Sequence, residues 1–539
     1  MPLIGTAGHV DHGKSTLIEA LSGRHPDRWA EEKQRGLTID LGFAWADLGD
    51  GGVVSFVDVP GHERFLKNML AGVDALDAVL LVVAADEGWM PQTEEHMAVI
   101  DLLGLHRGVI ALSKTDLVDE KRVMEVSAEV ARQLSGTTLE GHPIVPVSAF
   151  EPEDIHRLTD AVSSSIQGLR EADQGRPSLW GDRSFSVAGT GTVATGSLIG
   201  GSLSQGEEVE IYPEGPRAKI RSVRVHEEEV ELARPGFRTA LGLAGVAKTD
   251  VPRGVMIGQP GAWVCSDRFV ARIRLARYQE ELPDRAAYQA HLGTSTVNAR
   301  ILRRTGDKVL FSLDRPVPMA VGDRLILRDT GPRRVVAGGV VVDPTPSKKS
   351  LIVELNALPP DEMATALLDV RGMTDAARLR SETRGGAPKN GSAIDDLYVA
   401  DWMIEEVARQ VAALVAEHHA RHPLREGIRL AEVASSLGSP RAVIERAIET
   451  STALVRRGAD VALETHRPEL LPEQLEQWDR ARQILGAGLA VPRTADLGVS
   501  EETIHLLVRR GELIRISEDF VMLSAQVDRV RSVVGDLEP

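Results

Sequence analysis

The chain has 539 residues, of which 42% are hydrophobic, and its formal net charge at pH 7 is −17. This length predicts about three to five globular domains. The acidic charge excludes a protein that wraps nucleic acid over its whole surface, so any RNA contact must come from local basic patches. The single cysteine, Cys265, excludes an intramolecular disulfide. We expect no signal peptide, because the first residues lack a charged stretch followed by an apolar one, and no apolar run approaches about 18 residues. We therefore expect a cytoplasmic protein without a membrane span. We also expect a monomer.

The first predicted elements are a short buried strand at residues 2–6 and a helix that opens at residues 16–21. Between them lies the phosphate-binding loop pattern, with two glycines flanking four residues and followed by Lys and Ser. Glycines let backbone N–H groups bend around an anion, and the helix N-terminus adds partial positive charge. We expect Lys14 to reach the β- and γ-phosphates and Ser15 to ligate Mg²⁺; a glycine-rich turn that binds nothing is the alternative. The loop comprises Gly8, His9, Val10, Asp11, His12, Gly13, Lys14, Ser15 and Thr16.

Two later segments carry residues suited to the γ-phosphate. A charged stretch leads into residues 35–40, a predicted mobile loop in which Thr38 can close over the γ-phosphate and ligate Mg²⁺, unless it only caps a strand. A buried strand is predicted at residues 53–59, and Asp58 near its end is placed to hold Mg²⁺. Gly61 can turn its N–H toward the γ-phosphate. His62 follows as the residue that positions the attacking water, with an ordinary surface or core histidine as the alternative.

The residues predicted to read the base follow two further strands. We predict helices at 65–76 and 92–103 and buried strands at 78–84, 109–112 and 144–147. Ser113, Lys114 and Asp116 come after the strand at 109–112. A carboxylate at Asp116 can accept hydrogen bonds from guanine N1 and its 2-amino group, a donor pair that adenine lacks. Ser148 and Ala149 follow the last strand and can supply a backbone N–H to guanine O6.

Taken together, these motifs resemble the translational GTPases, and the Arg-Gly-Leu-Thr and Pro-Gly-His forms at residues 35–38 and 60–62 are similar to the elongation-factor-Tu branch. The resemblance implies GTP and Mg²⁺ as cofactors and hydrolysis of GTP. One residue departs from the family pattern, because Ser113 stands where the family has asparagine. Serine is shorter than asparagine and has no side-chain amide. We therefore expect Ser113 to lose the contact by which that amide ties the base-reading loop to the phosphate loop. Guanine selection through Asp116 is expected to survive.

From residue 184 the pattern changes to short alternating strands with glycine turns. Turn signals at intervals of about 8–12 residues predict two small β-barrels, at residues 174–260 and 261–345, after a nucleotide domain at 1–173. The barrels resemble domains II and III of the same branch. Stretches at 182–185, 291–294 and 337–344 are similar to one family in it, the selenocysteine-specific elongation factors or SelB family.

That resemblance implies a pocket for the selenocysteyl group, with Asp182, Arg183 and Arg238 at the matching positions. A selenol is ionised at neutral pH and a serine hydroxyl is not, so a guanidinium pair would favour selenocysteyl-tRNA over its seryl precursor. The alternative is that Asp182 and Arg183 are only a surface ion pair at the start of a strand.

The last third is rich in alanine, leucine, arginine and glutamate with helical spacing, and we divide it into modules at 346–400, 401–468 and 469–539. The modules resemble winged helices, and Ser439 is the expected N-cap of a helix with Pro440 at its first position. Arginine pairs at 456–457 and 509–510 could contact phosphates, although solvated surface is the more ordinary role. The SelB family has four such modules and uses them to bind a messenger hairpin. Because about three are predicted here, the sequence leaves binding of the messenger hairpin undecided.

The predicted fold class is thus multidomain: an α/β P-loop GTPase domain, two small β-barrels, and a mainly helical tail of winged-helix modules. The predicted function is a GTP-dependent elongation factor that binds selenocysteyl-tRNA and delivers it to the ribosome at UGA. A GTPase carrying another aminoacyl-tRNA is the first alternative. A regulatory GTPase that switches a protein partner is the second, and the two barrels argue against it.

Overall fold

A computed structural model describes residues 2–24, 42–49, 52–58, 76–169, 175–187, 189, 191–226, 228–331, 334–347, 359–488 and 491–535. The chain forms two compact units, the first comprising residues 1–371 and 377–389 and the second residues 372–376 and 390–539. Thr38, Gly61 and His62 lie outside the described residues, as does almost all of the helix predicted at 65–76. Among the described residues, no helix has the length and apolar character needed to cross a membrane.

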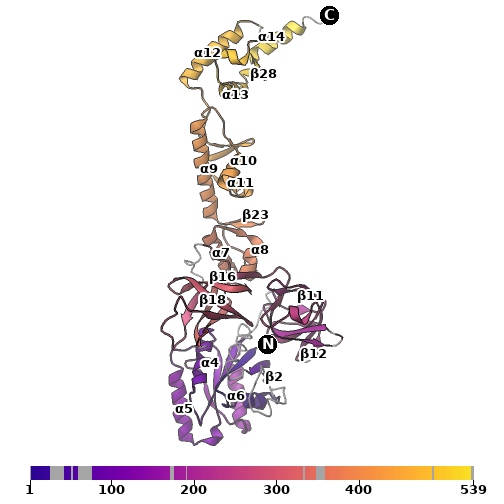
Figure 1. Ribbon diagram of the computed structural model, residues 1–539, viewed down its shortest axis with the longest axis vertical. Coiled ribbons are helices and arrows are strands. Elements are labelled where there is room, and N and C mark those ends of the chain that lie inside the picture. The colour runs from indigo at the N-terminus through magenta and orange to yellow at the C-terminus, as the bar shows by residue number, and fades with distance from the viewer. Residues whose placement is uncertain are drawn as a thin grey trace. The chain divides into compact units, whose positions relative to one another are not determined.

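The first unit opens with a six-stranded sheet in the order β2-β3-β1-β4-β5-β6 (Figure 1). The strands from β3 to β6 in this order run parallel, whereas β2 pairs antiparallel with β3 at one edge. The strands are β1 (Leu3–Gly8), β2 (Gly42–Asp47), β3 (Val53–Asp58), β4 (Ala78–Ala84), β5 (Gly108–Ser113) and β6 (Ile144–Pro146); the helices are α1 (Lys14–Ser22), α4 (Pro91–Leu102), α5 (Glu120–Gln133) and α6 (Pro152–Ser165). The strands predicted from apolar runs are all present, with ends that differ by one or two residues.

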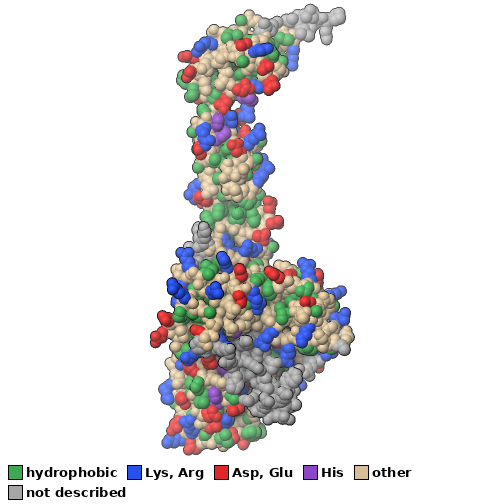
Figure 2. All heavy atoms as spheres, viewed as in Figure 1, with side chains coloured by type: hydrophobic (Ala, Val, Ile, Leu, Met, Phe, Trp, Pro, Cys, Tyr) green, Lys and Arg blue, Asp and Glu red, His purple; other side chains and the backbone are tan. Residues whose placement is uncertain are grey.

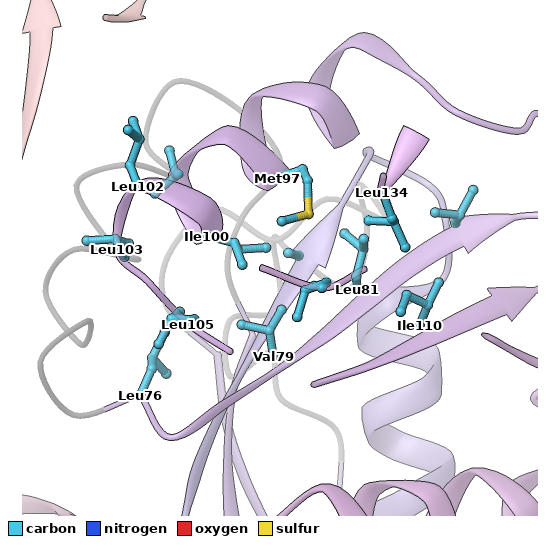
Figure 3. Close-up of a cluster of buried hydrophobic side chains, with 14 of the residues drawn as sticks. Leu76, Val79, Leu81, Met97, Ile100, Leu102, Leu103, Leu105, Ile110 and Leu134 are labelled. Atoms are coloured by element: carbon cyan, nitrogen blue, oxygen red, sulfur yellow. The ribbon is translucent and has the colours of Figure 1, made fainter. Parts of the chain in front are cut away.

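Helices cover both faces of this sheet, which is why its central strand is apolar throughout. All seven residues of β4 are buried. On one face, Val79 and Leu81 of β4 pack with Met97 and Ile100 of α4, as Figure 3 shows. On the other face, Leu80 packs in a second cluster that includes α1 and α6. Because β3, β1, β4, β5 and β6 run parallel, their carboxyl ends lie at the same end of the sheet, where ligands bind in open α/β sheets.

Two closed six-stranded β-barrels follow in the same unit. The first is built from β7 (Ser178–Val187), β8 (Gly191–Ile199), β14 (Phe237–Ala244), β11 (Arg217–Val225), β10 (Glu208–Tyr212) and β15 (Met256–Gly258), with β12 (Glu228–Val230) added beside β11. The second is built from β16 (Val264–Leu275), β19 (Lys308–Met319), β18 (Ser295–Thr305), β17 (Tyr288–Leu292), β20 (Arg324–Asp329) and β21 (Val335–Asp343). Inward-facing residues fill both barrels. In the second barrel the rings of Phe269 and Phe311 stack, with their centroids 5.3 Å apart.

Two helices after the second barrel are joined to it by a buried ion cluster. They are α7 (Pro360–Arg371) and α8 (Ala376–Glu382). The Arg371 guanidinium lies 2.5 Å from the Asp343 carboxylate at the end of β21 and also pairs with Glu382 of α8. Both carboxylate side chains are fully buried. Removing one partner from such a cluster leaves an uncompensated buried charge, which costs about 3–5 kcal/mol.

The second unit is helical with small antiparallel sheets. Its first sheet joins β22 (Met373–Asp375), β24 (Leu397–Val399) and β23 (Ser392–Ile394). Next come α9 (Asp401–Arg421), β25 (Ile428–Arg429), α10 (Leu430–Leu437), α11 (Arg441–Thr450), β26 (Leu454–Arg457) and β27 (Asp460–Leu463). The last group is α12 (Pro472–Gly486), α13 (Glu501–Arg509), β28 (Leu513–Ser517), β29 (Phe520–Leu523) and α14 (Ser524–Gly535). Among the described residues after α9, two helices followed by a two-stranded hairpin thus occur twice.

The predicted cap of α11 is wrong by one residue. The helix begins at Arg441, with Pro440 rather than Ser439 at the N-cap, and no side chain caps it. Pro440 has φ −55° and ψ 137°, which is not helical, and its carbonyl accepts hydrogen bonds from the N–H groups of Val443 and Ile444. The proline carbonyl therefore starts the helical hydrogen bonding from just outside the helix.

Candidate functional site

The phosphate loop connects the end of β1 to the start of α1. Gly8 has φ +134°, and a Cβ there would lie 2.1 Å from the Val82 carbonyl oxygen, so only glycine fits. Gly13 has φ +85° and precedes Lys14, the first residue of α1, without a side-chain cap. The first N–H groups of the helix are therefore open to an anion at this loop.

The Lys14 ammonium lies inside the loop. It donates to the carbonyl oxygens of His9 at 2.6 Å and Gly8 at 3.2 Å. Its pKa is lowered by burial, and the carboxylates of Asp58 and Asp11 oppose that shift. A buried cation held next to backbone N–H groups is suited to phosphate oxygens, which would compete for the hydrogens now given to the carbonyls.

The two described residues predicted to ligate a metal lie together. The Ser15 hydroxyl is 2.5 Å from Asp58 Oδ2 and donates to it, while Thr6 Oγ1 donates to Asp58 Oδ1 at 2.8 Å. Asp58 is fully buried at the end of β3, next to β1 in the sheet. A hydroxyl and a carboxylate are oxygen donors of the kind that Mg²⁺ takes.

Sequence reasoning missed the support that α4 gives to this loop. The Gly8 N–H donates to His96 Nδ1 at 2.8 Å, and the Val10 N–H donates to Gln92 Oε1 at 3.0 Å. Burial lowers the pKa of His96 well below its usual value, so the ring stays neutral and Nδ1 can accept. These partners are more than 80 residues apart in the chain, and local sequence patterns carry no signal for them.

A cavity of about 260 Å³ opens beside the phosphate loop at the carboxyl end of β5. Asp116 and Ala149, two of the predicted base-reading residues, both line it. The Ser148 N–H already donates to the Asp154 carboxylate at 2.8 Å, so Ala149 is the better placed of the pair to meet guanine O6. Phe150, which the sequence did not suggest, also lines the cavity and is 78% exposed. The cavity is lined by Asp11, Gly13, Thr16, Leu17, Ser113, Lys114, Asp116, Leu117, Ala149 and Phe150.

The expectation that Ser113 loses the tie to the phosphate loop is wrong. Its hydroxyl donates to the His12 carbonyl oxygen at 2.6 Å, and the side chain is buried. Because β5 brings Ser113 close to the loop, a short hydroxyl spans the gap. The next residue, Lys114, has left-handed geometry (φ +58°) and lies 3.6 Å from the Asp86 carboxylate.

A second cavity, of about 390 Å³, lies between the nucleotide domain and the first barrel. Two of the three residues predicted for the selenocysteyl pocket, Arg183 and Arg238, line it. Asp182 is not in the lining but contacts Arg238, whose two terminal nitrogens each donate a hydrogen bond to the Asp182 carboxylate. Asp182 is therefore paired with Arg238 rather than with its neighbour Arg183. The lining comprises Phe43, Ala44, Trp45, Ser55, Arg183, Phe185, Thr195, Arg224, His226, Arg238, Thr239 and Ala240.

Comparisons with known proteins agree with this architecture. Residues 1–168 match the elongation factor Tu GTP binding domain, and residues 266–348 match the beta-barrel domain of selenocysteine-specific elongation factor. A selenocysteine-specific elongation factor from Desulfomicrobium baculatum is 35% identical over 98% of this chain and 91% of its own length. The chain belongs to the selenocysteine-specific elongation factors. It is accordingly a translational GTPase.

Other similar proteins help to separate this family from its neighbours. The initiation factor 2 gamma subunit of Thermococcus kodakarensis is 33% identical, but the match covers 63% of this chain and 96% of that protein. A crystal structure of a bacterial selenocysteine-specific elongation factor, EF-Sec, matches all of this chain and 92% of its own, with a TM-score of 0.76 and 26% identity. The likeness to this elongation-factor family therefore extends through the tail, beyond the part shared with initiation factors.

The arginine pairs of the tail make contacts within the second unit. Arg457 donates to the carbonyl oxygen of His466 at 2.9 Å, and Arg456 lies 3.6 Å from Glu445. Arg509 pairs with Glu426 at 3.0 Å, and Arg510 donates to the Pro468 carbonyl oxygen at 2.7 Å. These arginines hold the elongation factor's own tail together, a role that sequence alone did not suggest.

Proposed function

We propose that this elongation factor binds GTP with Mg²⁺, carries selenocysteyl-tRNA and delivers it to the ribosome for insertion of selenocysteine at UGA. The observation that carries the proposal is the arginine-lined cavity between the nucleotide domain and the first barrel. It combines a cationic wall with a nucleotide site in the same unit, as a carrier controlled by GTP requires. We further propose that it acts in the cytoplasm.

The nucleotide contacts follow from the site. Lys14 and the N–H groups at the start of α1 hold the β- and γ-phosphates, Asp116 accepts from guanine N1 and the 2-amino group, and Ala149 donates to O6. Ser113 and Lys114 support the loop that carries Asp116. The remaining loop residues predicted to bind GTP are His9, Val10, Asp11, His12 and Thr16, together with Ser148.

The residues present fit a magnesium ion. Ser15 and Asp58 supply adjacent oxygens, and Thr38 is the third proposed ligand. Within the described ranges, no group of three or more His, Cys, Asp or Glu side chains is arranged to hold a metal, which suits an ion whose other ligands are phosphate and water. Bound there, Mg²⁺ would supply positive charge to the phosphate oxygens.

Hydrolysis requires a water in line with the γ-phosphate. We propose that His62 positions this water once the ribosome has contacted the loop, and that Gly61 and Thr38 hold the γ-phosphate through backbone and side chain respectively. Because phosphoryl transfer needs little covalent help from the protein, these residues act by positioning and by charge stabilisation. Loss of the γ-phosphate would release both loops and, with them, the tRNA.

Selectivity for the aminoacyl group rests on charge. Arg183 and Arg238 present guanidinium groups to the cavity, and Asp182 neutralises part of the charge on Arg238. A selenolate is an anion at neutral pH and gains from this arrangement, whereas a seryl hydroxyl does not. A charge-assisted contact of this kind contributes about 1.5–3 kcal/mol, or roughly ten- to a hundredfold in affinity.

Local basic patches are available for the tRNA body despite the acidic net charge. Arg217, Lys219, Arg221 and Arg224 are exposed along β11, and Arg300, Arg303 and Arg304 are exposed along β18. The face in Figure 2 shows Lys and Arg side chains spread over the barrels. The candidate arginines of the tail make internal contacts, so the proposed RNA contacts are those of the barrels.

Binding measurements test this function. With GTP present, the protein should bind selenocysteyl-tRNA more tightly than seryl-tRNA or any other aminoacyl-tRNA, and Lys14→Ala should abolish the GTP dependence. Equal affinity for all aminoacyl-tRNAs would favour a general carrier. No affinity for any of them, with GTP binding intact, would favour a GTPase that switches a protein partner.

A further inference from the structure

Helix α4 presents one of its faces to the phosphate loop. Gln92 and His96 are four residues apart, so their side chains lie on the same side of the helix. They accept hydrogen bonds from the N–H groups of Val10 and Gly8, at 3.0 and 2.8 Å respectively. Because both acceptors belong to one helix, the orientation of these two loop peptides depends on where α4 lies.

The opposite face of α4 carries carboxylates that pair with arginines of the second barrel. Glu94 Oε1 lies 2.9 Å from Arg277 Nε, and Asp101 Oδ2 lies 3.3 Å from Arg274 Nη2. Glu94 is two residues from each of the loop-binding side chains, which places it across a helix of 3.6 residues per turn, and Asp101 follows on the same side two turns later. Arg274 is on β16, and Arg277 comes two residues after that strand ends. Cations of the barrel thus hold α4 on the side away from the loop.

The pair of Arg277 and Glu94 is fixed by further partners. Arg277 Nη1 donates to the carbonyl oxygen of Gln133 at the end of α5, at 2.8 Å. The second carboxylate oxygen of Glu94 accepts from the Trp89 indole N–H at 3.1 Å. The side chains of Arg277 and Glu94 are 30% and 25% exposed, so water screens the pair only in part. Arg277 therefore joins the barrel to two helices of the nucleotide domain.

The apolar core around α4 continues into the second barrel. Ile326 and Val335 of the barrel belong to the same buried cluster as Met97 and Leu102 of α4. Gly338 on β21 permits the close approach, because a Cβ there would lie 2.8 Å from the Leu102 Cβ. Close packing of this kind resists displacement, so the position of α4 is set by the barrel as well as by the sheet.

We propose that Arg277 of the second barrel is a positioning residue for the nucleotide, which holds α4, and through Gln92 and His96 the phosphate loop, in the geometry that retains GTP. The rate at which GTP and GDP leave the site then depends on a barrel from which no described residue lines the base cavity. This inference rests on the proposed binding of GTP. It gives the ion pairs between α4 and the barrel a role beyond joining two domains.

The test measures how fast the full chain releases fluorescent GDP and a fluorescent, non-hydrolysable GTP analogue after rapid mixing with unlabelled nucleotide. Arg277→Ala should speed the release of both by roughly two- to thirtyfold, the range in which substitutions along a coupled network act. Arg272→Ala is the matched control. Arg272 pairs with Asp307 inside the second barrel, at 3.2 Å, so its loss should leave the release rate unchanged.

A double-mutant cycle shows whether the effect passes through α4. Gln92→Ala removes one contact between α4 and the phosphate loop and should itself speed release. In that background Arg277→Ala should change the rate by a smaller factor, since part of the path through which it acts is already lost. If Arg277 only stabilised the fold, its loss would lower the melting temperature and leave the release rate at the parental value.

The outcomes separate this inference from the proposed function. If the parent chain does not bind GTP, the proposed function fails. If the parent binds GTP and Arg277→Ala releases nucleotide at the parental rate, or if its effect is independent of Gln92→Ala, this inference is overturned while the function stands. Should Arg277→Ala not fold, as judged by thermal melting, Glu94→Gln removes the charge from the same pair and makes the same comparison.

Discussion

The hydroxyl of Ser113 donates to the carbonyl oxygen of His12 at 2.6 Å and so ties the base-reading loop to the phosphate loop. Ser113→Ala should remove this hydrogen bond and leave a buried carbonyl unsatisfied, at a cost of about 1–3 kcal/mol. We expect GTP and GDP to dissociate roughly five- to a hundredfold faster. Stopped-flow release of a fluorescent nucleotide measures this rate. Ser135→Ala, at an exposed serine, is the control, and equal release from parent and Ser113→Ala would show that the bond does not matter.

Asp116 should decide the identity of the base. Asp116→Asn replaces an acceptor with a donor, so guanine nucleotides should bind more weakly and xanthine nucleotides, which offer an oxygen in place of the 2-amino group, should now bind. Competition between GTP and XTP measures this exchange. An unchanged preference for GTP would mean that Asp116 lines the cavity without reading the base.

His62 should affect chemistry and not binding. His62→Ala should slow ribosome-stimulated hydrolysis by a factor on the order of a hundred or more, while GTP and tRNA affinities stay constant. Single-turnover hydrolysis with and without ribosomes separates the two effects. A normal stimulated rate would leave the histidine with a structural role alone.

The second unit should lose stability in mild acid through His419. Burial, and secondarily the neighbouring His466, lowers the pKa of His419 from 6.5 to about 4, and the two rings stack 3.5 Å apart. Between these two values His419 binds a proton in the unfolded chain but not in the folded chain. The free energy of unfolding therefore falls as pH drops from about 6.5 to about 4. His419→Phe should flatten this dependence in melting curves between those values. His505→Phe, at an exposed histidine, should not.

Long apolar runs and glycine-marked turns made much of the fold predictable. Because β4 is buried on both faces, it consists of seven consecutive apolar residues, and the phosphate loop is marked by Gly8 and Gly13, which both have positive φ. Contacts across the fold were not predictable in this way. Gln92 and His96 reach the phosphate loop from α4, and Phe43 reaches Arg238 from 195 residues away in the chain. Such pairs depend on how the sheet and barrels pack, which local pattern does not encode.

The buried cluster of Arg371, Asp343 and Glu382 determines where the chain can be truncated without loss of stability. A shortened chain that stopped at the last barrel strand would expose that strand's end and strip Asp343 of its cation. The GTPase and barrels should therefore be expressed with α7 and α8 attached, ending near residue 389, where the first unit itself ends.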